Sequence, residues 1–269
     1  MNPKYWLMKK TCVIILSLFL ATFLLCHQLF AQDKNADTAD PAHIFLSANQ
    51  AYKEGHYEQA AALYENLLAL EIINGNIFYN LGNSYLKAGK IGKALVKYRR
   101  AELFMPRNED LQANIQYALQ QTIDKIEGRD PYSYLKSFCF WYSRLTSREL
   151  VTVFLIANIG LWGIALFQLF KTKEYLWLVL YVFIASALLF GASAAIKVYS
   201  LYYNPGGVVT VREITVRSGG SINDTALFGL HEGAEFEWLD ESDGWIKIRL
   251  RDGKKGWVQK GTVEKVSIE

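Results

Sequence analysis

The sequence predicts a multidomain membrane protein: an all-α helical-repeat solenoid, two transmembrane helices and a small C-terminal all-β barrel. Three observations predict this fold class. Small and aromatic residues recur with a period of about 34 residues in the first half of the chain, which is typical of stacked helical hairpins. Two later apolar runs of about 21 residues carry no charge, as membrane-spanning helices do. The last part of the chain alternates between apolar and polar residues, with turn residues between the runs, which indicates strands.

The repeat is carried by small residues and tyrosines at matching positions. The four pairs, all at the same offset, are Ala48 and Gly82, Gly55 and Gly89, Ala60 and Ala94, and Tyr64 and Tyr98. Small residues permit two helices to approach closely, and aromatic residues wedge between neighbouring repeats. We expect repeats at 41–74 and 75–108, with Pro106 ending the last helix and a capping helix at 109–126.

The second repeat resembles the tetratricopeptide family. Eight residues fall on positions of that pattern: Phe78, Leu81, Gly82, Tyr85, Ala94, Tyr98, Ala101 and Pro106. The first repeat keeps Ala48, Tyr57, Ala60 and Tyr64, but has Ile72 where the pattern has proline. The resemblance implies a concave face that binds protein segments.

The N-terminus is typical of a signal peptide, predicted at 1–31. Three lysines precede an apolar run, and Ala31 offers a cleavage site. Two alternatives stay open: an uncleaved anchor, and lipidation of Cys26, which follows Leu25 where a small residue is usual.

Two apolar segments, 150–170 and 175–196, are predicted to cross a membrane, because each is long enough to span roughly 30 Å of hydrocarbon. The short connection forces an antiparallel hairpin. Its Lys171 and Lys173 indicate the cytoplasmic side. We therefore expect a bacterial inner-membrane protein with both soluble parts in the periplasm, as the signal peptide also indicates.

The segment 127–149 mixes aromatic residues with lysine and arginine, which favours an interfacial linker at the lipid headgroups.

Segment 207–269 shows the alternation of short strands, and Asp252-Gly253 marks a hairpin. Its glycines, tryptophans and Arg-Ser-Gly at 217–219 resemble bacterial SH3-like domains. In such barrels one tryptophan lines a surface groove while others fill the core. The candidate surface residues are Arg217, Trp245 and Trp257, with core packing as the alternative for the tryptophans.

A second candidate site is the inner face of the repeats, hereafter the repeat groove. Its predicted residues are Phe45, Asn49, Tyr52, Lys53, Tyr79, Asn83, Leu86 and Lys87. Some tetratricopeptide proteins hold a peptide carboxylate there. Here Phe45, Asp110 and Asn114 replace cations of that clamp, so we expect an internal segment as the ligand, with a solvated face as the alternative.

The composition gives no support for several functions. The histidines are scattered among the modules without metal-ligand spacing, and no phosphate-binding glycine motif occurs. We expect no catalytic residues, no metal and no cofactor. The chain has a formal net charge of +3, and its basic residues are dispersed. Arg99 and Arg100 are predicted on a solvated helix face, and nucleic-acid binding is not indicated.

The order of signal peptide, tetratricopeptide repeats, membrane hairpin and SH3-like domain resembles the BatE family of the Bacteroides aerotolerance operon. The resemblance implies a non-enzymatic membrane scaffold that works beside von Willebrand factor A-type membrane proteins in stress tolerance. The alternative is a cell-wall adaptor that binds peptidoglycan and recruits peptidoglycan enzymes through its repeats.

Overall fold

The computed structural model describes residues 40–125, 139–171, 173–203 and 205–267. They form two compact units. One consists of residues 147–196, and the other joins the chain before residue 147 to the chain after residue 196. The predicted signal peptide with Cys26, the last residue of the predicted capping helix, and residues 127–138 of the predicted interfacial linker lie outside the described residues.

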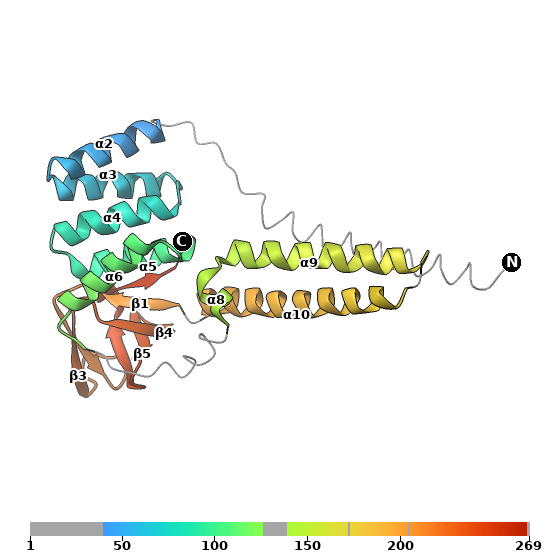
Figure 1. Cartoon of the computed structure of the whole chain (residues 1–269). Coiled ribbons are helices and arrows are strands. Elements are labelled where there is room, and N and C mark those ends of the chain that lie inside the picture. Colours follow the sequence, from blue (N-terminus) through green and yellow to red (C-terminus); the bar gives the residue numbers. More distant parts are fainter. Residues whose placement is uncertain (1–39, 126–138, 172, 204, 268–269) are drawn as a thin grey trace. The chain divides into compact units, whose positions relative to one another are not determined.

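The second unit begins with helices that pack one after another (Figure 1). Their bounds are α2 Pro41–Lys53, α3 Tyr57–Ala69, α4 Gly75–Lys87, α5 Ile91–Phe104 and α6 Glu109–Gln121. Gly55 and Gly89 have positive φ angles of 83° and 77° in the turns after α2 and α4, a conformation that glycine adopts without strain. The expected helical hairpins therefore form at 41–69 and 75–104.

The helical core contains the small residues of the repeat pattern. Ala48, Ala60 and Ala94 are fully buried. A Cβ atom on Gly82 would lie 2.6 Å from the ring of Tyr98, so α4 and α5 approach as closely as they do because position 82 has no side chain.

Helix α6 is shorter than the predicted capping helix 109–126. It ends at Gln121, and Thr122 is extended, with its hydroxyl donating to the carbonyl of Leu119 over 2.8 Å. Ile123, which lies beyond the end of the helix, is exposed, whereas Leu111 in its first turn is fully buried.

Residues 205–267 form a seven-stranded antiparallel sheet of order β3-β2-β6-β5-β4-β1-β7. The bounds are β1 Gly206–Val209, β2 Glu213–Arg217, β3 Ala226–His231, β4 Glu235–Ser242, β5 Trp245–Arg249, β6 Lys255–Gln259 and β7 Val263–Val266, with a 3-10 turn, η1 Lys260–Thr262, before β7. The predicted hairpin at Asp252-Gly253 joins β5 to β6, and Gly253 has a φ of 89°.

The prediction of a closed barrel is wrong. Within residues 205–267, β3 and β7 are the two edge strands of an open sheet, and no hydrogen-bonded pairing joins them. The β1–β7 end packs against α5 of the helical region instead. Helix α5 therefore covers the end of the sheet that a closing strand would otherwise pair.

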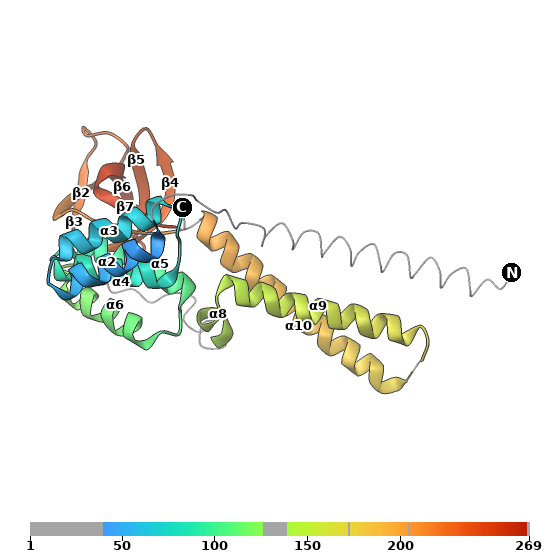
Figure 2. The same cartoon turned by 90° about the horizontal axis from the view of Figure 1, so that it is seen from above.

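The other unit is a pair of helices joined by a short connection. Helix α9, Ser147–Gln168, and the part of α10, Glu174–Tyr203, up to residue 196 are each long and apolar enough to cross a membrane. Figure 2 shows them crossing at an angle. Gly160 of α9 faces the ring of Phe183 on α10, and Gly191 of α10 faces the ring of Phe154 on α9. Each helix therefore accommodates an aromatic ring of its neighbour at a glycine of its own.

A short helix, α8 Phe140–Arg144, precedes α9. Lys197, in the last turns of α10, donates to the carbonyls of Tyr142 and Leu145 over 3.0 and 2.5 Å. Its ammonium group also lies 5.4 Å from the centre of the Tyr142 ring. A lysine of α10 therefore binds backbone carbonyls at the C-terminal end of α8.

We predict that Gly82→Ala destabilises the helical region by about 1–3 kcal/mol, because the new methyl group overlaps the Tyr98 ring. Helix propensity alone favours alanine by about 1 kcal/mol, so the two effects have opposite signs. Thermal unfolding of the full chain in detergent micelles, followed by circular dichroism, measures the difference. The exposed Gln116→Ala is the control, and a higher midpoint for Gly82→Ala would contradict the close contact.

Candidate functional site

The first candidate site, the repeat groove, lies on α2 and α4. Its predicted residues occupy equivalent positions of the two repeats: Phe45 and Tyr79, Asn49 and Asn83, Tyr52 and Leu86, Lys53 and Lys87. The two lysines are exposed and the other six side chains are half-buried. Hydrogen bonds between amides of α2 and α4, and of α4 and α6, place these helices side by side.

The two predicted asparagines of the groove are engaged inside the protein. Asn49 Oδ1 accepts from the hydroxyl of Tyr64 over 2.6 Å and from Nδ2 of Asn80 over 3.4 Å. We call this set and its equivalent in the next repeat the amide ladder. These asparagines hold neighbouring helices together, so they are poor candidates for ligand contacts.

The equivalent set forms the same bonds one repeat later. Asn83 Oδ1 accepts from the hydroxyl of Tyr98 over 2.8 Å and from Nδ2 of Asn114 over 2.9 Å. Asn114 also donates to the hydroxyl of Tyr79 over 3.1 Å. The sequence contained this signal, because the tyrosines and all four asparagines obey the repeat offset, but the sequence reasoning did not connect them.

Burial of the ladder tyrosines changes their acidity. Burial raises the pKa of Tyr64 to about 12, and it raises the pKa of Tyr98 further above the ordinary value. The neutral hydroxyls are the donors of the ladder, so the folded state retains protons that the unfolded chain releases above pH 10.

Lys53, Lys87 and Tyr52 remain for ligand contacts in the repeat groove. In the described part of the chain neither lysine forms a salt bridge. A hollow of about 640 Å³ is lined by Asn49, Tyr52 and Lys53 with four other residues of α2. It does not reach the predicted residues on α4, so the structure does not gather the predicted set into one pocket.

The second candidate site is an outer face of the sheet, hereafter the sheet face, formed by Arg217, Trp245, Lys247 and Trp257. Register places Arg217 and Lys247 on either side of Trp257. The Lys247 ammonium lies 5.7 Å from the centre of the Trp257 ring. Trp245 is two residues before Lys247 on β5 and therefore points to the same side of the sheet.

All four side chains of the sheet face are partly exposed. The alternating residues Val216, Ile246 and Val258 are buried in the core of the sheet. Trp238 belongs to that core and is 8% exposed. The three predicted surface residues therefore come together, and Lys247 is a member that the sequence reasoning missed.

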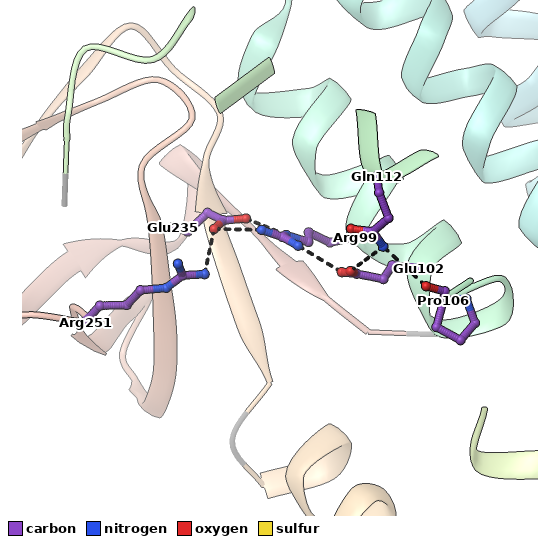
Figure 3. Close-up of polar contacts among 6 residues, drawn as sticks. All are labelled: Arg99, Glu102, Pro106, Gln112, Glu235 and Arg251. Atoms are coloured by element: carbon purple, nitrogen blue, oxygen red, sulfur yellow. Dashed lines mark hydrogen bonds and ion pairs between the residues drawn. The ribbon is translucent and has the colours of Figure 1, made fainter. Parts of the chain in front are cut away.

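A third polar cluster lies where α5 meets the sheet, hereafter the helix–sheet interface (Figure 3). Arg99 donates through Nε and Nη2 to the carboxylate of Glu235 on β4, over 2.6 and 3.1 Å, and through Nη1 to Glu102 over 2.9 Å. Arg251 donates to Glu235, and Gln112 to Glu102. Burial alone lowers the pKa of Arg99, but the two carboxylates outweigh it and raise that pKa.

The prediction that Arg99 and Arg100 lie on a solvated helix face is wrong. Their side chains are only 20% and 15% exposed, and they pair with Glu235 and Glu264. Both carboxylates belong to strands of the distant C-terminal sheet, so no local pattern could reveal them.

Among the described residues, no group of three or more His, Cys, Asp or Glu side chains has an arrangement that could hold a metal ion.

Comparison with known proteins identifies the sheet. Residues 212–264 match the family of the bacterial SH3 domain, and the match includes every residue of the sheet face. No curated protein matches the chain significantly. The match supports the predicted SH3-like domain over residues 212–264.

We predict that Asn83→Ala destabilises the protein by about 1–3 kcal/mol, because the buried hydroxyl of Tyr98 and the half-buried amide of Asn114 lose their acceptor. Lys87→Ala, an exposed change on the same helix, should shift stability by less than about 0.5 kcal/mol. Thermal unfolding of the full chain in micelles compares the two. Equal midpoints would show that the amide ladder does not hold the helices together.

Alkaline pH should weaken the helical region. The raised pKa of Tyr64 gives a contribution that is complete below pH 10 and is lost as pH rises toward 12. We expect the temperature midpoint of unfolding to be lower at pH 11 than at pH 9. In Tyr64→Phe with Tyr98→Phe this fall should be smaller, although the variant is less stable at pH 8. An identical pH dependence would exclude the ladder tyrosines as its source.

Proposed function

We propose that this protein is a non-enzymatic scaffold, held in the bacterial inner membrane by a transmembrane hairpin, that binds other molecules through its soluble parts. The observation that carries the proposal is the sheet face of a bacterial SH3 domain. Two half-exposed tryptophans beside two cations offer flat apolar surface and charge, a composition typical of binding hot spots. This face suits peptides of the cell wall or of a protein.

The helix–sheet interface supports the proposed topology. The helical region and the sheet are in contact, and the two apolar helices lie between them in the sequence. Contact requires both parts to lie on the same side of a membrane, and an even number of crossings achieves this. Together with Lys171 and Lys173 in the connection, this favours a periplasmic location for both parts.

The amide ladder supports the tetratricopeptide interpretation of the helical region. It repeats with the period of that family, and the second helix of each hairpin supplies the tyrosine hydroxyl. We propose that the repeat groove binds a protein segment through Tyr52, Lys53 and Lys87. A membrane protein of the von Willebrand factor A type is the partner class that the BatE resemblance implies.

A second candidate function is favoured by the SH3 match itself, since a bacterial SH3 domain suggests binding to cell wall as well as to protein. In that case the sheet face holds peptidoglycan and the repeat groove recruits a wall enzyme.

Co-sedimentation of the full chain in micelles with purified sacculi separates the two functions. For a cell-wall adaptor we expect sedimentation that Trp257→Ala weakens at least about tenfold, the effect of losing a binding hot spot. The matched control is Leu227→Ala, an exposed apolar residue of the same sheet.

For a membrane scaffold we expect no sedimentation. Cross-linking in membranes should then capture a von Willebrand factor A-type protein that is lost when Tyr52, Lys53 and Lys87 are all replaced by alanine. A chain that neither sediments nor captures such a protein would refute both functions.

A further inference from the structure

Helix α5 depends on the sheet for part of its hydrophobic burial. Val208 of β1 and Val266 of β7 belong to the same buried cluster as the helical core, which includes Leu95 and Val96 of α5. The sheet has a second cluster of its own, around Ile246 and other residues. The two valines therefore extend the core of the helical region across the helix–sheet interface.

The sheet also supplies the N-terminal cap of α5. Helices α2, α4 and α6 are capped by their own Asp40, Asn74 and Asn108. Helix α5 has no side-chain cap of its own. Instead the amide of Gly92 in its first turn donates to Oε1 of Glu232 over 2.8 Å. A carboxylate at this position satisfies a free amide and is attracted by the helix dipole.

A buried lysine of α5 has its counter-charge on the sheet. The Lys97 side chain is 8% exposed, and its ammonium group lies 2.9 Å from the carboxylate of Glu264 on β7. Arg100 pairs with the same carboxylate over 3.1 Å and donates to the carbonyl of Lys265. With the sheet in place Lys97 is buried, so removing Glu264 alone would leave its ammonium group without this counter-charge in the folded protein, which is unfavourable.

The fit between α5 and the sheet is close enough to restrict the residue at position 92. A Cβ atom on Gly92 would lie 2.3 Å from the carbonyl oxygen of Val209 and 3.0 Å from Cα of Thr210. Beyond the end of α6, Asp124 accepts from the backbone amide of His231 over 2.6 Å. The contact thus extends from the start of α5 to the segment after α6.

We infer that the two apolar helices are an insertion within one cooperative folding unit. In this unit Glu232, Glu264, Val208 and Val266 of the sheet complete α5. The helical region then reaches its full stability only after the chain has passed through both apolar helices and returned to α5. If these helices span the membrane as proposed above, a stable repeat groove forms only in a chain whose hairpin has inserted with both ends on the same side.

Hydrogen exchange of the full chain in detergent micelles tests the inference independently of membrane topology. Glu264→Ala leaves Lys97 without its partner. We expect amides of α4 and α5 to exchange at least about tenfold faster, although the change lies on β7. The matched control is Glu241→Ala, which removes the exposed ion pair with Lys260 inside the sheet and should leave α4 and α5 unchanged.

A double variant identifies the cause. Lys97→Met with Glu264→Ala removes the unpaired charge, so protection of α4 and α5 should largely return. Faster exchange confined to β7 in Glu264→Ala, with both helices still protected, would overturn the inference. It would leave the proposed binding functions untouched.

Gly92→Ala tests the same inference by a change on α5 instead of on the sheet. It applies even if the Glu264→Ala variant does not fold. Helix propensity predicts slower exchange in α5, because alanine favours helix over glycine. The contact with Val209 predicts faster exchange in α5 together with β1. Slower exchange in α5, or an effect that stops at α5, would overturn the inference.

Discussion

The ion pair between Lys97 and Glu264 is the interaction on which the arrangement of the soluble unit depends. A charged lysine at a buried position of a helix is costly without a counter-charge, and here the carboxylate comes from the last strand. The pair thus fixes which end of the sheet faces α5. The position of β1, β4 and the remaining strands follows from their pairing with β7 and with each other.

The polar residues of the helical region divide into two groups with different tasks. The asparagines and tyrosines of the amide ladder satisfy one another and hold successive helices in register. The exposed lysines at the ends of α2 and α4 have no such partner in the ladder. A surface with structural amides beneath and exposed cations above is well suited to bind partners without changing its own packing. The sheet face shows the same division, with valines and isoleucines beneath and tryptophans and cations above.

Local patterns revealed most of the elements but not how the two soluble parts meet. The repeat offset located the helical hairpins, the uncharged runs located two helices apolar enough to span a membrane, and alternation located the bacterial SH3 domain. The tetratricopeptide assignment and the BatE resemblance stay predictions. Arg99 was misplaced because its partner Glu235 is 136 residues away. Sheet closure was predicted wrongly for a related reason, since α5, a distant helix, covers the end of the sheet.

The two asparagines of the repeat groove show why ligand-binding residues are hard to identify from repeat positions in the sequence alone. Asn49 and Asn83 have the spacing of ligand-binding residues, but the same spacing serves a bond to the tyrosine that follows 15 residues later. In a repeat protein, residues that bond within the stack and residues on its surface recur with the same period. Periodicity alone therefore does not distinguish structural residues from ligand-binding ones. The direction and the hydrogen-bond partners of each side chain distinguish the two kinds of residue.

The amide ladder also determines how such a protein can change length. In each repeat one asparagine accepts a hydrogen bond from the following helical unit, and another donates to the preceding unit. A duplicated repeat could therefore form the same hydrogen bonds on both sides. Near the other end of the stack, α5 packs against β1 and β7 of the sheet. Repeats added before α2 would lengthen the groove while the attachment of α5 to the sheet stayed unaltered.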